Sequence, residues 1–509
     1  MNLEQFDKVR GLTAAEHALL LRLVNLWSRT SIRNKLRTRY YEFKNTLDNI
    51  GIAIPPELEH IEVCVSWPAK AVDALQARSK FNGFAFDGSQ DRDLVEILRD
   101  NNFASMYRQL TTSELIHSCS FVTVSRGTGN EPEAVINAFS AESAVAIWDS
   151  RRKRIGCGLT FVSFEDSDTG QVPSEVHMHT SDAIITLQKF GSYWHADRKR
   201  HAMGWPMMEA FVFRPSLKRP FGKSRISRPV MSITDSTVRG LLRYELSAEL
   251  FSAPQRYLLG ADESNITKTK WETYLDSMLV ANRDADGETP IYGQLPQVSM
   301  QPHTGYIKDQ AGLFSSATSI PLSSLGIVHD NPPSAEAIHA NTEDLVIEAE
   351  ALNDSNGGSL RNLALMILAI KENTTIDRLT PEQKSVMPVF KNPMRASLGS
   401  RADATLKMVQ AVPGMSESNV ILEHLGFDES EIARINEDRT IAEGRAELDR
   451  LLENPSTAVM PTEGTSTLIT VIKAVREDAM SEGQAAGIIS VSLGMTRGEA
   501  LALVRGNES

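Results

Sequence analysis

Between Phe121 and Pro215 the sequence consists largely of short runs rich in β-branched and aromatic residues, separated by Gly, Asp and Asn. The clearest of these runs are FVTVSRG, AVAIWDS, GLTFVSF, AIITLQKFGSYWHA and MEAFVFRP. Short β-rich runs at this spacing predict a mixed, largely antiparallel sheet. The stretch DSRRKRIG, which begins at Asp149, predicts a hairpin turn with a solvated basic tip.

The residues on both sides of this block predict helices. Residues 13–16 form a capping box, and leucines at helical spacing follow it before a run of basic residues that we interpret as a solvated helix face. After Pro229, apolar residues recur about every fourth position until Pro254 ends the pattern. We expect Ser232 and Asp235 to cap the start of this second helix.

Three further segments follow in the C-terminal half. Residues 306–318 predict a shorter helix, and residues 319–334 are too rich in Pro and Ser for regular structure, which indicates a functional loop. Residues 335–372 predict another helix, which the polar, glycine-containing segment Asn353–Gly358 should break or kink. Several helices are expected after Ala402, with Gly426 as a carboxyl cap.

Size and composition limit the class of protein. A chain of 509 residues predicts two to four domains, and 41% hydrophobic with 23% charged residues is typical of a folded, soluble protein. The longest strongly apolar run, Leu363–Ile370, is far shorter than the roughly 20 residues that cross a bilayer, so no membrane partner is expected. The three widely spaced cysteines, Cys64, Cys119 and Cys157, favour a reducing cytoplasm. A net charge of −12 argues against a protein that holds nucleic acid tightly.

Three motifs resemble chemical sites without meeting their requirements. Gly222-Lys223-Ser224 resembles the end of a phosphate loop, but Leu217 stands in place of the first glycine and Pro229 lies where the following helix should run, which argues against an NTPase. Residues 282–287 resemble the start of a calcium loop, but Gly293 replaces its bidentate glutamate, which favours a hairpin turn.

The third motif places Glu175, His177 and His179 on one face of a predicted strand. A metal is conceivable there, although a solvated strand face is the favoured interpretation. We therefore expect no cofactor, no metal and no catalytic residue.

The C-terminal stretch SEGQAAGIISVSLGMTRGEALALV has the spacing of a helix-turn-helix. Glu482 and Glu499 are poorly placed for phosphates, and a packing unit is the favoured interpretation. Two alternative functions nevertheless stay open at this point. One is a DNA-binding regulator that uses these helices, and the other is a terminase-like NTPase.

Several blocks resemble portal proteins of tailed double-stranded DNA phages, particularly those that infect actinobacteria. They are GKSRISRPVMSITDSTVRGLLRYELSAELFSAPQRYLLGAD from Gly222, SWPAKAVDALQARSKFNGF from Ser66, SIPLSSLGIVHDNPPSAEAIHANTEDLVIEAEA from Ser319, and ADATLKMVQ with LGFDESEI further on. The resemblance spans roughly residues 13–452, and its motifs are structural rather than catalytic.

The resemblance implies an α+β portal fold with an α/β wing, a helical stem, a small α/β clip and an α-helical crown, assembled as a ring. The implied parts are residues 1–231 (wing), 232–256 (first stem helix), 257–302 (clip), 303–318 (second stem helix), 319–333 (tunnel loop), 334–400 (kinked wing helix and the segment after it), 401–452 (crown) and 453–509 (a C-terminal helical extension, crown-associated or flexible).

The implied function is a non-enzymatic channel at one capsid vertex of the virion, assembled in the host cytoplasm, through which double-stranded DNA is packaged and ejected without sequence specificity. The implied partners are further copies of the chain in a ring of about twelve, the terminase large subunit, the major capsid protein and scaffold, and a head-tail adaptor protein.

Three groups of site residues follow from the implied function. The residues expected to face the DNA in the tunnel loop are Pro321, Leu322, Ser323, Ser324 and Leu325. Those expected to damp DNA motion from the stem, with a salt bridge to a neighbouring subunit as the alternative, are Arg239, Arg243 and Lys308. Those expected to dock the motor or adaptor at the clip are Trp271, Tyr274 and Tyr292.

Overall fold

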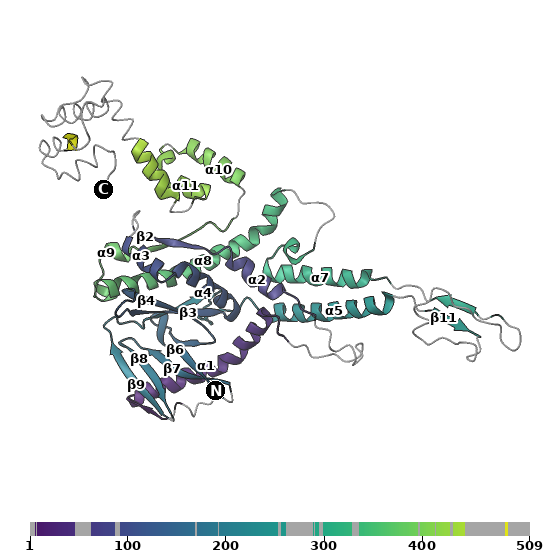
Figure 1. Cartoon of the computed structure of the whole chain (residues 1–509), viewed down its shortest axis with the longest axis horizontal. Helices are drawn as coiled ribbons and strands as arrows, with labels where there is room; N and C mark the ends of the chain where they lie inside the picture. The colour runs from purple at the N-terminus through teal and green to yellow at the C-terminus, as the bar shows by residue number, and fades with distance from the viewer. Residues whose placement is uncertain are drawn as a thin grey trace, which may run out of the picture. The chain divides into compact units, whose positions relative to one another are not determined.

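The structure is a computed structural model (Figure 1). It divides into two compact units, Met1–Met394 and Arg395–Ser509. It describes residues 6, 8–45, 63–86, 92–167, 170–191, 193–252, 256–260, 289, 291–294, 299–327, 335–394, 398–412, 414–427, 431–442 and 484–486. Among these residues, no helix is both long enough and apolar enough to cross a membrane.

The β-rich block forms two sheets in the first unit, so the predicted antiparallel pairing is confirmed but the single sheet is not. One sheet has the order β1-β9-β8-β7-β6-β5 and is antiparallel except for the parallel pair β1 and β9. Its strands are β1 (Val9–Arg10), β5 (Ala144–Asp149), β6 (Arg154–Ser167), β7 (Gly170–His179), β8 (Ala183–Phe190) and β9 (Tyr193–Arg200). The turn between β5 and β6 exposes Arg151, Arg152 and Lys153, as predicted.

The other sheets are smaller. The second sheet has the order β10-β3-β4, and two further pairs of strands are antiparallel, β11 with β12 and β13 with β2. Their strands are β2 (Phe81–Ala85), β3 (Cys119–Arg126), β4 (Ala134–Ser140), β10 (Met208–Val212), β11 (Arg256–Leu259), β12 (Ile291–Gln294) and β13 (Met387–Phe390).

The helices of the first unit are α1 (Ala14–Tyr41), α2 (Trp67–Gln76), α3 (Arg92–Asp100), α4 (Phe103–His117), α5 (Arg228–Ser252), α7 (Gln301–Thr318), α8 (Ala335–Lys371) and α9 (Pro381–Lys384), with 3₁₀ turns η4 (Leu322–Leu325) and η5 (Ile376–Arg378). The second unit contains α10 (Leu398–Ala411), η6 (Met415–Glu417) and α11 (Asn419–Leu425), followed by helical residues 431–442. Gly426 caps α11 in a left-handed conformation, as predicted.

Helix α1 begins at the predicted capping box, where the Thr13 amide donates to Glu16 Oε2 at 2.8 Å and the Glu16 amide donates to Thr13 Oγ1 at 3.3 Å. Arg198 on β9 also binds the Glu16 carboxylate, at 2.6 Å. Leu20, Leu23 and Val24 of α1 are buried in one apolar cluster with residues of the six-stranded sheet. Burial of this leucine stripe therefore fixes α1 along the sheet.

Two helix starts differ from the prediction. Helix α5 begins at Arg228 and α7 begins at Gln301, and each has a proline in its first turn. Proline is tolerated there because the first amides of a helix have no intrahelical acceptor, so its missing N–H costs no hydrogen bond. Asp235 therefore lies inside α5 and does not cap it. Its carboxylate instead accepts a hydrogen bond from the Tyr40 hydroxyl at 2.8 Å.

Helix α8 runs without a break through Asn353–Gly358, so of the two predicted outcomes, a break or a kink, the break is wrong. Ser355 Oγ donates to the carbonyl of Val212 at 2.7 Å, and Ser359 Oγ donates to that of Ala210 at 2.6 Å. Strand β10 is the edge strand of its sheet, and the two serines, one helical turn apart, supply donors to its carbonyls. The polar segment is therefore helical because it completes the hydrogen bonding of a sheet edge.

The asparagines of the same segment enter a buried polar network. Ser79 Oγ donates to Asn353 Oδ1 at 2.6 Å, and Asn356 Nδ2 donates to Glu114 Oε2 at 3.0 Å. Glu114 lies on α4 and is fully buried, and this burial raises its pKa to about 8. Glu114 is therefore protonated in the folded chain at neutral pH, which avoids a buried unpaired charge.

The raised pKa of Glu114 predicts a pH-dependent stability. Between its ordinary pKa of 4.5 and about 8, the folded chain keeps a proton that the unfolded chain loses, so the free energy of unfolding should fall as pH rises through this range. Glu114→Gln should remove this contribution, on the order of a few kcal/mol, and raise the urea midpoint most at pH 8.

Two other glutamates serve as comparisons for the pH dependence of Glu114→Gln. The pKa of Glu209 is raised by burial to about 7, so a weaker slope of the same sign should remain in Glu114→Gln. The exposed Glu343→Gln should leave the wild-type slope unchanged. An unchanged pH slope in Glu114→Gln would contradict the assignment.

Candidate functional site

Helices α5 and α7 form an antiparallel pair that leaves the body of the first unit (Figure 1). The rings of Tyr244 and His303 lie 6.2 Å apart, and the Tyr306 hydroxyl donates to the Ser236 carbonyl at 3.4 Å, which fixes the opposite directions of the two helices. Gly240 allows this approach, because a Cβ there would lie 2.7 Å from Tyr306 Cε1. These helices overlap the two segments predicted as stem helices, but both start earlier and α5 ends at Ser252 rather than at residue 256.

The chain between α5 and α7 contains the ladder of β11 and β12. Tyr292 on β12 is 51% exposed, and Leu259 and Ile291 are also exposed on these strands. Trp271 and Tyr274, the other two residues predicted to dock partners, lie outside the described residues. So do most of the calcium-like loop at residues 282–293 and nearly all of the helix-turn-helix-like C-terminal stretch.

The segment after α7 corresponds to the predicted tunnel loop, and it contains the short 3₁₀ turn η4 despite its Pro and Ser content. Ser323 and Ser324 are exposed, whereas Pro321 and Leu322 are half-buried. Leu325 differs from the expectation, because its side chain is only 8% exposed and packs in the apolar core with Ile320. Its side chain anchors the loop in this structure and does not face outward.

Arg225 joins the elements around the start of this loop. Its guanidinium donates to the Thr318 carbonyl at the end of α7 and to the Ala71 carbonyl of α2, both at 2.6 Å. Its third partner is Glu348 on α8, with Nη1 to Oε2 at 2.6 Å. One side chain from the connector between β10 and α5 therefore ties α2, α7 and α8 together.

Arg225 and its partner Glu348 are both buried. Arg225 is 5% exposed and Glu348 is 8% exposed, and burial lowers the pKa of Arg225 while Glu348 opposes this shift. Arg214 adds a second cation, with Nη2 at 2.7 Å from Glu348 Oε1, but its side chain is mostly exposed. Two carbonyls thus bind the buried arginine and two cations face the buried glutamate, which offsets the cost of burying their charges.

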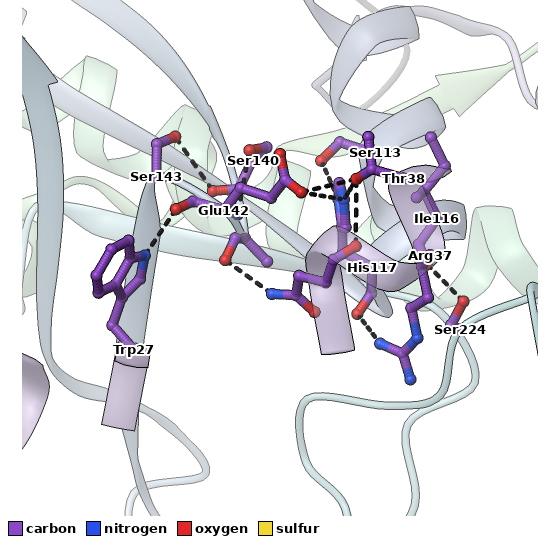
Figure 2. Close-up of polar contacts among 12 residues, drawn as sticks. Trp27, Arg37, Thr38, Ser113, Ile116, His117, Ser140, Glu142, Ser143 and Ser224 are labelled. Atoms are coloured by element: carbon purple, nitrogen blue, oxygen red, sulfur yellow. Dashed lines mark hydrogen bonds and ion pairs between the residues drawn. The ribbon is translucent and has the colours of Figure 1, made fainter. Parts of the chain in front are cut away.

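The phosphate-loop-like residues lie in this same connector and have structural roles. Ser224 Oγ is buried and donates to the Ile116 carbonyl, as Figure 2 shows. The Lys223 amide donates to the Phe213 carbonyl at 2.9 Å, and no helix begins until Arg228. The connector therefore lacks the ring of free amides followed by a helix that binds nucleotide phosphates.

The predicted strand face with Glu175, His177 and His179 exists on β7, where His177 Nε2 lies 2.7 Å from Glu175 Oε1. His179 is buried, and burial lowers its pKa to about 3. Among the described residues, no three His, Cys, Asp or Glu side chains are placed to hold a metal ion.

The three predicted stem cations differ in their surroundings. Arg243 on α5 and Lys308 on α7 are exposed, whereas Arg239 is half-buried and its Nη2 donates to Ser236 Oγ at 3.3 Å. Sequence reasoning missed Arg225 and Glu348 altogether. No local signal distinguishes Arg225 from its solvated basic neighbours, since its burial depends on three segments that are distant in sequence.

Arg225→Met should destabilise the protein by about 3–5 kcal/mol, because it leaves Glu348 buried beside a single, mostly exposed cation and frees two carbonyls. The urea midpoint should fall, and proteases should cut at residues 319–327 sooner. Arg214→Met is the matched control, since it removes an exposed partner of the same carboxylate and should cost less than about 1 kcal/mol. Equal losses in the two variants would contradict the central role of Arg225.

Comparison with known proteins agrees with the resemblance seen in the sequence. A family model described as "Phage portal protein, SPP1 Gp6-like" matches residues 22–444. The portal proteins of Mycobacterium phage D29 and Mycobacterium phage L5 are each 23% identical to this chain, over 386 and 385 residues, which are 73% of this chain and 78% and 77% of those proteins.

Similar solved structures include a chain of "Virion of native gene transfer agent (GTA) particle", with a TM-score of 0.39, 12% identity and coverage of 70% of this chain and 89% of that one. Another is a chain of "Neck of empty GTA particle computed with C6 symmetry", with a TM-score of 0.42, 11% identity and coverage of 77% and 93%. The family match, which covers most of the sequence, confirms the resemblance and disfavours the regulator and NTPase alternatives. The chain belongs to the phage portal protein family of the SPP1 Gp6-like type.

Proposed function

We propose that twelve copies of this chain form a ring at one capsid vertex of a virion, after assembly in the host cytoplasm. The channel of the ring conducts double-stranded DNA during packaging and ejection, and the chain itself performs no catalysis. The family match is the observation that carries this proposal. The ATPase that drives packaging is then a separate protein.

The α5–α7 pair supports the ring arrangement. A closed ring needs one side of each subunit to contact a different side of the next, and paired helices repeated around an axis can form such a wall. A net charge of −12 also suits a channel, because DNA must slide and a strongly basic wall would retain it through counterion release.

In this proposal η4 is the part of the tunnel loop nearest the DNA. Ser323 and Ser324 are exposed and uncharged, so they contact a phosphate backbone without ion pairing. Pro321 and Leu322 border them, while Leu325 holds the turn in the core. The Arg225 bond to the Thr318 carbonyl fixes the base from which this loop begins.

The three basic residues of the stem helices differ in how available they are for contact with DNA. Arg243 and Lys308 are exposed on α5 and α7 and are available to DNA or to a neighbouring copy. Arg239 is partly committed to Ser236, so its role in DNA contact is smaller. We propose that Arg243 and Lys308 slow DNA motion by weak, screened contacts.

The clip is the proposed docking surface. Tyr292, Leu259 and Ile291 expose apolar area on β11 and β12, and Trp271 with Tyr274 belong to the same segment of sequence. The terminase large subunit would dock there during packaging and the head-tail adaptor afterwards. The major capsid protein and scaffold would contact the wing.

Mass photometry and negative-stain imaging of the purified chain test the ring directly. The expected result is a closed particle of about twelve subunits with a central hole. Duplexes of unrelated sequence should show the same weak affinity. A particle that stays monomeric at all protein and salt concentrations would overturn the proposal.

Arginine at the tunnel loop provides a second test. Ser323→Arg together with Ser324→Arg should reduce packaged DNA by about tenfold or more, since every subunit adds two phosphate-binding charges at the constriction. Ser105→Arg with Ser150→Arg adds the same charge at exposed positions elsewhere and should package normally. Normal packaging by the loop variant, with rings intact by imaging, would show that the loop does not contact DNA.

A further inference from the structure

A cavity of about 900 Å³ opens between α1, the end of α4 and the connector before α5. Arg37, which borders the cavity, donates from Nη1 to the His117 carbonyl at 2.8 Å, and the Trp27 indole on the same helix donates to the Glu142 carbonyl, as Figure 2 shows. Asn34 Nδ2 also donates to the Ala141 carbonyl at 2.9 Å. These bonds tie α1 to the end of α4 and to the residues just before β5.

Four cations border this cavity without an ion-pair partner among the described residues. Arg33, Arg37, Arg219 and Lys223 all border it, and none of them has a carboxylate within ion-pair distance among the described residues. Burial lowers the pKa of Arg37, and the nearby charges of Arg33 and Arg219 lower it further. The site thus concentrates positive charge that an anionic group would stabilise.

In the part of the chain that the structure describes, Glu142, which Figure 2 labels, forms no ion pair with these cations. Glu142 Oε1 accepts a hydrogen bond from Thr38 Oγ1 at 2.7 Å and lies 3.8 Å from His117 Nε2. Burial lowers the pKa of His117 to about 4, so this histidine is neutral at pH 7. Glu142 therefore serves the internal network.

Apolar side chains border the same cavity. Leu36 is 43% exposed there, and Phe221 and Met231 are half-buried. Leu217, on the loop that also carries Arg219, is fully exposed. A binding surface that combines a cationic rim with an apolar floor matches a ligand that carries both carboxylates and apolar side chains.

The cavity continues along α1 into a second hollow of about 280 Å³, which shares Leu26 and Phe221 with the first and is bordered by Arg22 and Arg29. Arg22, Arg29, Arg33 and Arg37 recur at helical spacing along one face of α1. Arg22 and Arg37 are fifteen residues apart, so at the helical rise per residue the row is about 22 Å long. That length fits about seven residues of extended peptide or about four turns of helix.

We propose that this groove is a docking site for an acidic peptide segment with interspersed apolar side chains, provided by another protein. Its carboxylates pair with Arg33, Arg37, Arg219 and Lys223, and its apolar side chains enter the floor. A DNA duplex fits less well, because a rigid cylinder bearing phosphates leaves the apolar floor empty. The proposal concerns the wing surface and does not depend on ring formation or on the channel.

Fluorescence anisotropy with the purified full chain tests the proposal. The probe is a labelled peptide of about 15 residues made of Glu and Leu, and its comparison probes replace Glu by Gln or Leu by Ala. A labelled DNA duplex forms the fourth arm. The Glu/Leu peptide should bind at least about tenfold more tightly than the Gln/Leu and Glu/Ala peptides, since it alone satisfies both rim and floor.

Variants locate the binding. Arg33→Glu with Arg219→Glu should weaken Glu/Leu peptide binding about tenfold or more, whereas Lys70→Glu with Arg151→Glu makes the same charge change at exposed positions outside the groove and should have little effect. Leu36→Ser should weaken the Glu/Leu peptide but not the Glu/Ala peptide. All five positions are exposed, so unfolding midpoints should stay constant.

Three results would overturn the proposal. The first is no binding of the Glu/Leu peptide by the wild-type chain at low salt. The second is an equal loss in the groove variant and the control variant, which would indicate a general charge effect. The third is tighter binding of the DNA duplex with the same dependence on Arg33 and Arg219, which would assign the groove to nucleic acid.

Discussion

The buried ion pair between Arg225 and Glu348 is the interaction on which the centre of this protein depends. Its arginine comes from the connector before α5, its glutamate comes from α8, and the same guanidinium binds carbonyls of α2 and α7. A buried charge without partners is costly, so each element keeps the others in place. Around the pair, Trp67 and Phe314 pack with ring centroids 5.3 Å apart in the same apolar cluster. The helices that would line a channel are thus anchored at one polar centre.

Much of the fold could be predicted from local sequence because the responsible interactions are local. The capping box at residues 13–16, the β-rich runs and the stripe of α5 each contain their own signal. The segment Asn353–Gly358 of α8 could not be predicted correctly, because the helix there is stabilised by contacts with β10 and Glu114. Tertiary hydrogen bonds outweighed the low intrinsic helix propensity of that segment.

The candidate site shows the same division. The loop after α7 was indicated by its Pro and Ser content and by the family resemblance, and its residues Ser323 and Ser324 are exposed. The burial of Leu325 and the role of Arg225 were not predictable, because both depend on packing between segments far apart in the chain. The basic residues of α1 were interpreted as a solvated face, and Arg29 and Arg33 are indeed exposed. The fold adds that Arg33 and Arg37 border the larger hollow, and Arg22 and Arg29 the smaller one.

The contact between Gly240 and Tyr306 has a consequence for how this family member tolerates change. The distance between α5 and α7 is set by the absence of a single methyl group, since a Cβ at residue 240 would overlap the tyrosine ring. In a symmetric assembly a substitution appears in every copy of the chain, so the same increase in the distance between α5 and α7 would occur in each subunit. In the proposed ring, one substitution at residue 240 would therefore change the spacing of the helix pair in all subunits at once.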